Sequence, residues 1–409
     1  MQYPPRELIV ITLAVSLTLL GDSLLYAVLP TIWHKIGLEL WMVGALLSAN
    51  RFIRFLTNPI AGRLVERYGL RKPFMVAVFL AAITTVAYGL TFGFLVFLVA
   101  RLFWGACWSV LRLGGFLSAL GSSNSKTQGF HLGFFSGCTR IGTLAAVLIG
   151  SFLVDYIGFS STVWIFGILI FLGGIILVRE PIHDAPVLSP DPIIKASIGK
   201  TTSTLTDRRR WIIYALSCIN GMAGSQLVVV TLGLWLFENF GEKIDLFNLS
   251  MGVASFTGVL LSGRFLIEVL WAPTAGHLSD RFSRIKFILL AVVIMCVTIT
   301  FFSYQSDLFF GVLAAGIIFL TGTAFRVAMD AYMGEITPPQ QRARVMSWYV
   351  NWSDLGNALG PFLAYQLVKL VGLGLVYRGA AIALIGIGIP LILILRTTSD
   401  QIILSRKLV

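Results

Sequence analysis

A chain of 409 residues that is 57% hydrophobic and only 12% charged, with a mean hydropathy of +0.86, is not composed like a soluble protein, because soluble domains carry about 25% charged residues. A net charge of +12 would suit a nucleic-acid binder, but the Lys and Arg residues lie mostly in short stretches between long apolar runs, which excludes that function. The composition indicates helices that cross a hydrocarbon layer about 30 Å thick. The runs are too long and too continuous for β-barrel strands.

Twelve apolar runs follow one another along the chain, and each predicts a transmembrane helix. The first is too long for a signal peptide, and no cleavage site follows it, so we expect it to remain as the first helix. The runs cover residues 8–30, 40–61, 73–92, 94–119, 130–155, 160–178, 211–236, 248–275, 286–304, 308–332, 346–369 and 376–395.

The widest polar gap separates the first six runs from the last six. It contains four prolines and a Ser/Thr-rich stretch, a composition typical of a linker. We therefore expect an all-α membrane protein with twelve transmembrane helices. An N-terminal six-helix bundle is predicted over residues 1–180, a cytoplasmic linker over 181–210 and a C-terminal six-helix bundle over 211–409.

The distribution of basic residues predicts the orientation in the membrane. About 20 Lys and Arg residues fall on the side of the two termini, and four fall on the other side: Lys35, Lys243, Lys369 and Arg378. Basic loops stay on the cytoplasmic side. The pattern predicts a multi-pass protein of the inner (plasma) membrane with both termini in the cytoplasm.

The two halves of the chain repeat at one fixed spacing. The segment from Pro59 to Lys72 matches the segment from Pro273 to Lys286. The same spacing relates three further pairs: Arg112 and Arg326, Gly142 and Gly356, Gly158 and Gly372. Parallel repeats of six helices are a feature of one large class of transporters.

Three motifs resemble those of the major facilitator superfamily. The segment Gly62-Arg-Leu-Val-Glu66-Arg67-Tyr-Gly-Leu-Arg71-Lys resembles its signature loop, G-x-x-x-D-R-x-G-R-R/K. Gly276-His-Leu-Ser-Asp280-Arg281 is similar to the weaker second copy of that loop, and Arg101-Leu-Phe-Trp-Gly105 resembles the fourth-helix motif of proton-coupled members. The fifth predicted helix lacks the Gly-Pro of drug:proton antiporters, whereas Gly360-Pro361 occurs in the eleventh.

The resemblance implies two six-helix bundles that rock about a central site and carry a small solute by alternating access. The signature loops then imply a cytoplasmic gate, in which carboxylates meet helix N-termini and arginines. The alternative is that the loops only enforce topology. The residues expected at the gate are Gly62, Glu66, Arg67, Arg71, Arg112, Asp280, Arg281 and Arg326.

Charged residues inside the apolar runs are candidates for a central polar site, because a charge at the bilayer centre costs about 2.5–3.5 kcal/mol and must find partners. The helix neighbours implied by the resemblance would place Arg140 near Glu268 and Arg264, and Asp354 near Arg51 and Arg54. Solute or protons would compete for these charges; the alternative is a set of permanent structural salt bridges. Asp330 lies four residues after Arg326, so these two side chains can pair on one helix face.

Asp22 has no basic neighbour on its own predicted helix. Burial disfavours the charged form of a lone carboxylate, so Asp22 is the candidate for a residue that takes up and releases a proton. Arg101 would modulate that proton, because a nearby cation favours the carboxylate. The alternative is a structural Asp that is hydrogen-bonded to a neighbouring helix.

The sequence thus predicts a secondary active transporter, proton-coupled and suited to the efflux of amphipathic compounds, with a small solute, protons and lipid as partners and no nucleic acid. Seven intramembrane arginines against four acids favour, as an alternative, a carrier for an organic anion or anionic lipid. A transporter-like sensor without flux is a second alternative. An enzyme, an ATP-driven pump, a metal site and a cofactor are not expected, and the chain is expected to act as a monomer.

Overall fold

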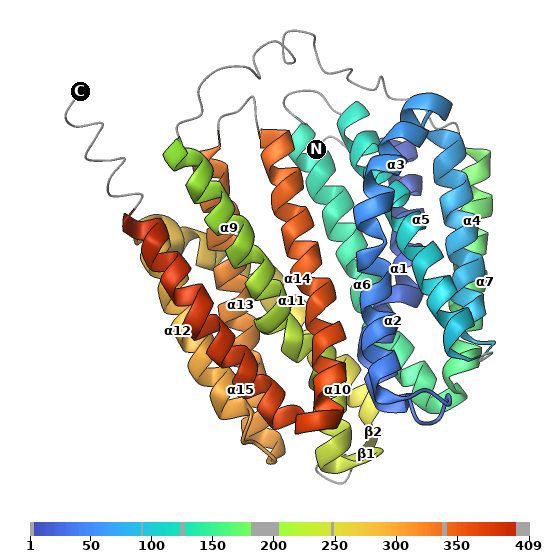
Figure 1. The fold of residues 1–409 in the computed structure, drawn as a ribbon. Helices are drawn as coiled ribbons and strands as arrows, with labels where there is room; N and C mark the ends of the chain where they lie inside the picture. The colour runs from blue at the N-terminus through green and yellow to red at the C-terminus, as the bar shows by residue number, and fades with distance from the viewer. Residues whose placement is uncertain are drawn as a thin grey trace, which may run out of the picture. The chain divides into compact units, whose positions relative to one another are not determined.

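In a computed structural model of the protein, the structure describes residues 4–90, 93–122, 127–180, 204–246, 249–337 and 342–397. These residues are helical apart from one short hairpin and the connections between helices (Figure 1). The contacts divide the chain into two compact units. Unit 1 comprises residues 1–189 and 232–262, and unit 2 comprises residues 190–231 and 263–409.

Unit 1 is built around a long first helix. This helix, α1, packs on α6 over much of its length and also contacts α7, α5, α4 and α2, while α4 lies between α5 and α7. The core of unit 1 is made of Leu, Ile, Val, Ala and Phe side chains, with Trp104 among them. The helices are α1 (Arg6–Ile32), α2 (Leu40–Phe52), α3 (Arg54–Tyr68), α4 (Arg71–Tyr88), α5 (Phe94–Gly121), α6 (Gln128–Ile157) and α7 (Phe159–Arg179).

Unit 2 repeats the pairing of long helices. α9 and α14 pack along each other, and α12 packs on α13 and α15 (Figure 1). The elements of the second half are α9 (Thr204–Ala223), α10 (Ser225–Phe240), β1 (Lys243–Leu246), β2 (Leu249–Gly252), α11 (Val253–Arg281), α12 (Arg284–Phe302), α13 (Leu308–Ile336), α14 (Arg342–Val371), α15 (Leu373–Ala383) and the π-helical turn η3 (Leu384–Gly388). The later part of α10, the hairpin and the start of α11 belong to unit 1.

Ten helical segments within the described ranges are long and apolar enough to cross a membrane. The α2–α3 segment and α14 are not among them. The break at Ile53 leaves α2 and α3 with 13 and 15 residues, each too short to span a membrane alone. α14 is long enough but less apolar, since it carries Asp354 and several other polar residues.

Three of the predicted runs differ from the structure in detail. Run 40–61 is divided at Ile53, whose carbonyl accepts the amides of both Leu56 and Thr57 at 3.0 Å, a tightened turn just before Pro59. Run 211–236 is divided at Gly224, where the amide of Leu227 bonds back three residues. The eighth predicted helix, 248–275, begins only at 253, because β2 pairs with β1 before it.

The repeated glycines have the same structural role in both halves. Gly142 of α6 faces α1, and a Cβ there would lie 2.6 Å from the carbonyl oxygen of Ser16; a Cβ at Gly356 of α14 would overlap the carbonyl of Cys218 on α9. Gly158 and Gly372 adopt φ of 85° and 78° at the ends of α6 and α14. The sequence repeat therefore preserves two close helix contacts and two left-handed turns.

Asp155, near the end of α6, caps the first turn of α11 within unit 1. Its carboxylate accepts hydrogen bonds from the backbone N–H of Ser255 at 2.8 Å and from the Ser255 hydroxyl at 2.5 Å. The first amides of a helix have no partner inside the helix, and a carboxylate suits the positive end of the helix dipole. Gly252 leaves room for this carboxylate, which a Cβ would overlap.

A second, exposed contact lies at the end of α1. Glu242 accepts from Lys35 at 2.9 Å and lies 3.3 Å from His34, whose ring stacks on Phe237. The hydrogen bonds from Lys35 and then from His34 lower the pKa of the Glu242 carboxyl. Together with Asp155, this contact ties residues 232–262 to the first helices of the chain.

Substitution of Gly142 by Val should destabilise unit 1 by about 1–3 kcal/mol, because the added atoms must push α6 away from α1. Gly133→Ala on the same helix is the matched control, since a Cβ there meets nothing within 4 Å. Thermal unfolding of the purified protein in detergent measures both. Equal melting temperatures for the two variants would contradict the close contact.

Asp155→Ala should lower the free energy of unfolding by about 1 kcal/mol, which is typical for the loss of an N-cap. Asp155→Asn keeps an oxygen that can accept from Ser255 and should lose less. Asp245→Ala, in the exposed strand β1, serves as the control in the same unfolding assay. The capping role is wrong if Asp155→Ala unfolds at the same temperature as Asp245→Ala.

Candidate functional site

A buried ion pair lies in the core of unit 1. The Arg101 guanidinium on α5 donates from Nη1 to Oδ1 of Asp22 on α1, and its Nε donates to the carbonyl of Leu46 at 2.9 Å. The Arg101 side chain is 0% exposed and that of Asp22 is 9% exposed. A charge at this depth is tolerated only when it is paired and hydrogen-bonded, and this pair meets both conditions.

Asn50 on α2 completes the cluster around Asp22. Its amide nitrogen Nδ2 donates to the same carboxylate oxygen, Oδ1, at 2.8 Å. Asn50 is fully buried. Three helices thus meet at one carboxylate. Asp22, which has no basic neighbour on its own helix, is paired with Arg101, the cation expected near it, and is also hydrogen-bonded to a neighbouring helix through Asn50.

Aromatic rings and arginines surround this cluster. Trp104, one turn after Arg101, is fully buried and stacks on Trp108 with 5.7 Å between ring centroids. The guanidinium of Arg54 lies 5.8 Å from the Trp108 ring, and that of Arg51 lies 5.4 Å from the ring of Tyr26. Such cation–π contacts stabilise an arginine away from water, so Arg51 and Arg54 have aromatic partners within unit 1.

Unit 2 contains a cavity of about 90 Å³. It is bounded by α9, α10, α11, α13 and α14, and eleven of its fifteen lining residues are polar or charged. The lining consists of Ser217, Asn220, Gly221, Ser225, Gln226, Arg264, Glu268, Phe319, Gly322, Thr323, Phe325, Arg326, Tyr349, Ser353 and Asn357. Small polar groups with a few aromatic rings are what a solute site needs for orientation and contact area.

The charges of this cavity form a connected set. Arg326 on α13 donates to Glu268 on α11 at 2.6 Å and lies 3.9 Å from Asp330, which accepts from the Tyr349 hydroxyl at 2.8 Å. The contact between Arg326 and Asp330 confirms that these residues share one helix face. Arg264, one turn before Glu268, lies over the rings of Phe265 and Phe319 at 5.3 and 6.0 Å.

One residue expected at the cytoplasmic gate, Arg326, lines this cavity. Arg326 was expected near Asp280 at the cytoplasmic gate, but its side chain donates to Glu268 in the cavity. Asp280 binds Arg284 instead, at 2.8 Å, and Arg284 also contacts Glu335 at 3.0 Å. The reason is the short turn between α11 and α12, which brings Arg284 at the start of α12 next to Asp280 near the end of α11.

The other expected gate residues lie on exposed parts of the chain. Arg67 stacks on Tyr68, and Arg71 donates to the carbonyl of Val178 at 3.1 Å, which joins the start of α4 to the end of α7. The roles of Gly62, Glu66, Arg112 and Arg281 at a gate stay predictions. So do the pairs of Arg140 with Glu268 and of Asp354 with Arg51 and Arg54, because each joins residues of different units.

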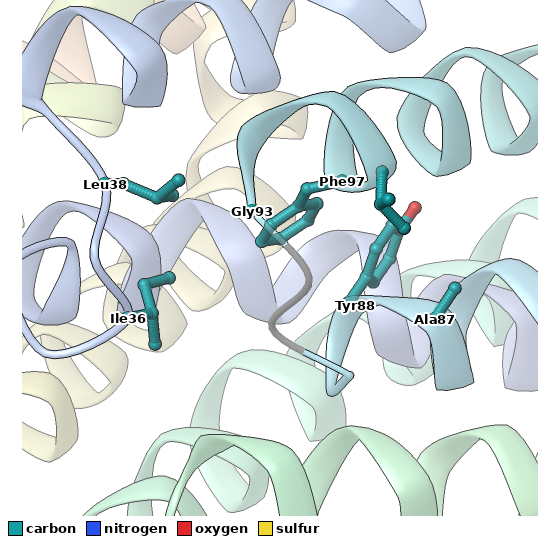
Figure 2. Close-up of a pocket in the computed structure, with 7 residues that line it drawn as sticks. Ile36, Leu38, Ala87, Tyr88, Gly93 and Phe97 are labelled. Atoms are coloured by element: carbon teal, nitrogen blue, oxygen red, sulfur yellow. The ribbon is translucent and has the colours of Figure 1, made fainter.

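A second hollow, near the start of α5, is too small for a solute. It measures about 10 Å³, and its walls are Ile36, Leu38, Ala87, Tyr88, Gly93, Val96 and Phe97 (Figure 2). A space of this size holds at most about one water molecule, and its walls are mostly apolar. Within the described ranges, no three His, Cys, Asp or Glu side chains gather as metal ligands would.

Several functional candidates were missed from the sequence. Asn50 lies next to Arg51 in an apolar run, and a polar amide inside a predicted transmembrane helix indicates a hydrogen bond between helices. The hydroxyls and amides of α9, such as Ser217 and Asn220, were overlooked because only charged residues were considered. The bond of Tyr349 to Asp330 joins two helices, α14 and α13, so no local pattern in the sequence predicts it.

The chain matches the family model of the Major Facilitator Superfamily over residues 11–268 and 250–403. This chain belongs to the major facilitator superfamily. Among curated relatives, it is 21% identical to the quinolone resistance protein NorA of Staphylococcus aureus (strain COL), over 95% of this chain and 96% of NorA. It is 23% identical to the synaptic vesicular amine transporter of Rattus norvegicus, over 81% of this chain and 62% of that protein.

Solved structures of the superfamily share the fold. A bacterial homolog of the human lysosomal transporter Spinster matches with a TM-score of 0.77 at 14% identity, over 96% of this chain and 97% of the other. The nucleoside transporter NupG matches with a TM-score of 0.71 at 14% identity, over 95% and 98%. The predicted fold class is therefore confirmed: the chain is an all-α, multi-pass membrane transporter of this superfamily and not an enzyme.

Loss of one partner of the buried pair should destabilise the protein more than loss of both partners. Arg101→Met leaves Asp22 without its cation and should lower the free energy of unfolding by about 3 kcal/mol. The double variant Asp22→Asn/Arg101→Met should regain part of this stability. Unfolding in mixed detergent micelles measures it, with Arg63→Met on the exposed face of α3 as the control. A double variant no more stable than Arg101→Met would contradict the pairing.

Proposed function

We propose that this chain is a proton-coupled secondary transporter that exports amphipathic compounds by alternating access, with the proton carried by Asp22. The observation that carries the proposal is the buried pair of Asp22 and Arg101. A proton that binds Asp22 competes with Arg101 for the carboxylate, so the charge of the core changes with each proton taken up. Such a change can bias the conformation of a transporter.

The proposed solute site includes the cavity of unit 2, whose volume of about 90 Å³ is smaller than a drug-sized ligand fills, so the site must widen when an amphipathic compound binds. Its hydroxyl and amide groups suit the polar part of an amphipathic compound, and the rings of Phe319, Phe325 and Tyr349 suit the apolar part. Likeness to the quinolone resistance protein NorA supports export, and likeness to the synaptic vesicular amine transporter supports an organic solute. The proposed location is the plasma membrane with both termini in the cytoplasm, as the basic loops indicate.

A carrier for an organic anion is the second candidate. The observation in its favour is that the cavity has two arginines, Arg264 and Arg326, against one acid, Glu268. A carboxylate or phosphate of the solute could replace Glu268 as the partner of Arg326, because arginine binds both groups in the same bidentate manner.

The proposal is tested with proteoliposomes that hold a pH-sensitive dye. Lipophilic cations, zwitterions and organic anions are added in turn to wild type, Asp22→Asn and the exposed control Asp245→Asn. We expect one class of solute to trigger proton flux in wild type and in the control, and the flux to fall at least about ten-fold in Asp22→Asn. Proton flux that is unchanged in Asp22→Asn would overturn the role of Asp22, and flux with anions alone would favour the second candidate.

A further inference from the structure

We propose that Asn50 reads the protonation state of Asp22: its side-chain amide donates to the ionised carboxylate and, after turning over, accepts from the protonated one. This inference rests on the proposed function, because it assumes that Asp22 exchanges a proton. It makes Asn50 a positioning residue, which acts through Asp22 and not on the solute.

The position of Asn50 is fixed by close packing of three helices. Nδ2 lies 2.8 Å from Oδ1 of Asp22, the oxygen that also accepts from Arg101. α5 approaches α2 so closely at Gly105 that a Cβ there would lie 2.8 Å from the Cα of Asn50. Asn50 is 0% exposed, so bulk water does not compete for its amide.

The chemistry of the three side chains assigns different abilities to each. An ionised Asp only accepts hydrogen bonds, whereas a protonated Asp also carries one O–H donor. Arg101 has only donors, so it cannot accept that proton. Asn50 has both a donor and an acceptor on one amide, and a half-turn of the amide exchanges them. Both partners can donate to Asp22 in either protonation state, but of the two only Asn50 can also accept a hydrogen bond from the protonated acid.

The acceptor needed for the second state is available. Oδ1 of Asn50 is buried and has no hydrogen-bond partner among the residues that the structure describes. An unsatisfied buried acceptor is costly, and an O–H on Asp22 would satisfy it. Asp22 exchanges the proton with solvent through its 9% exposed carboxylate, so no other covalent bond forms or breaks.

Among the described residues, Asn50 and Arg101 are the side chains that hydrogen-bond to Asp22. Arg101 on α5 stays attached to the carbonyl of Leu46 through Nε. Tyr88 on α4 and Tyr26 on α1 lie in the field of the pair, and Arg51 on α2 stacks over Tyr26. None of these three side chains hydrogen-bonds to the carboxylate, whereas Asn50 does.

The consequence is a link between the proton and α2. The hydrogen bond between α1 and α2 is present in both states but runs in opposite directions. Since α2 leads through Ile53 into α3, which holds the signature residues Gly62 and Glu66, the turn of this amide connects the proton site to the loop expected at the gate.

The test compares two variants of the same shape, Asn50→Thr and Asn50→Val. Only Thr keeps a group that both donates and accepts. Solute-driven proton flux is measured over a range of pH in proteoliposomes. We expect the proton flux of Asn50→Val to fall about ten-fold, which corresponds to the cost of one unsatisfied buried hydrogen bond. Its pH profile should be flattened. Asn50→Thr should lie between Asn50→Val and wild type and keep the wild-type shape.

Thr57→Val is the matched control. It removes the 2.8 Å hydrogen bond between Thr57 and Ser109, which joins α3 to α5 without touching Asp22, and should keep the pH profile of wild type. Infrared difference spectra between acid and alkaline buffer give a second readout. The carboxyl band that Asp22→Asn abolishes should shift in Asn50→Val and not in Thr57→Val, whether or not transport survives.

Two results would overturn the inference. Identical pH profiles for the Thr and Val variants would mean that only the shape of residue 50 matters. An Asp22 carboxyl band unchanged in Asn50→Val would mean that the amide does not bond to the protonated acid. Either result leaves the proposed function intact if Asp22→Asn still abolishes proton flux. Proton flux that is retained in Asp22→Asn would overturn the proposed function itself.

Discussion

The cost of a charge inside a hydrocarbon layer dominates the interior of this protein. Arg101 is wholly buried, and no single partner satisfies its guanidinium: the carboxylate of Asp22 takes one nitrogen and the carbonyl of Leu46 takes another. Three helices must therefore stay in register around one carboxylate. Any process that neutralises Asp22 changes what holds α1, α2 and α5 together, so electrostatics and helix packing are coupled at this point.

The sequence repeat shows how one scaffold supports two different sites. Its fixed spacing relates Asn50 to Arg264 and Arg54 to Glu268. In unit 1, Asn50 is fully buried against Asp22, whereas Arg264 borders a polar cavity in unit 2. The repeated glycines Gly142 and Gly356 keep two helix contacts alike, but Gly105, which faces Asn50, corresponds by the same spacing to Phe319, which lines the cavity.

Composition, helical runs and repeat spacing were sufficient for the fold, because each depends on local patterns and the signature loops are contiguous in sequence. The site was harder to predict. Asp22 on α1 and Arg101 on α5 pair directly although they lie far apart in the sequence. The pairing of Arg326 with Asp330 followed from helical spacing, but its contact with Glu268 was not predicted, because depth in a membrane does not say which way a helix face turns. Asn50 carries no charge, so a search for charged residues overlooked the group that bonds directly to Asp22.

The contacts of residues 232–262 bear on how such a fold could move. By the repeat these residues belong to the second half of the chain, yet they pack with the first, through the Asp155 cap on α11 and the exposed Glu242 contact. Rocking of the two sequence halves would break both. An N-cap is worth about 1 kcal/mol, and an exposed ion pair adds little. Contacts of this strength hold one conformation and still open within the range of a solute's or a proton's binding energy.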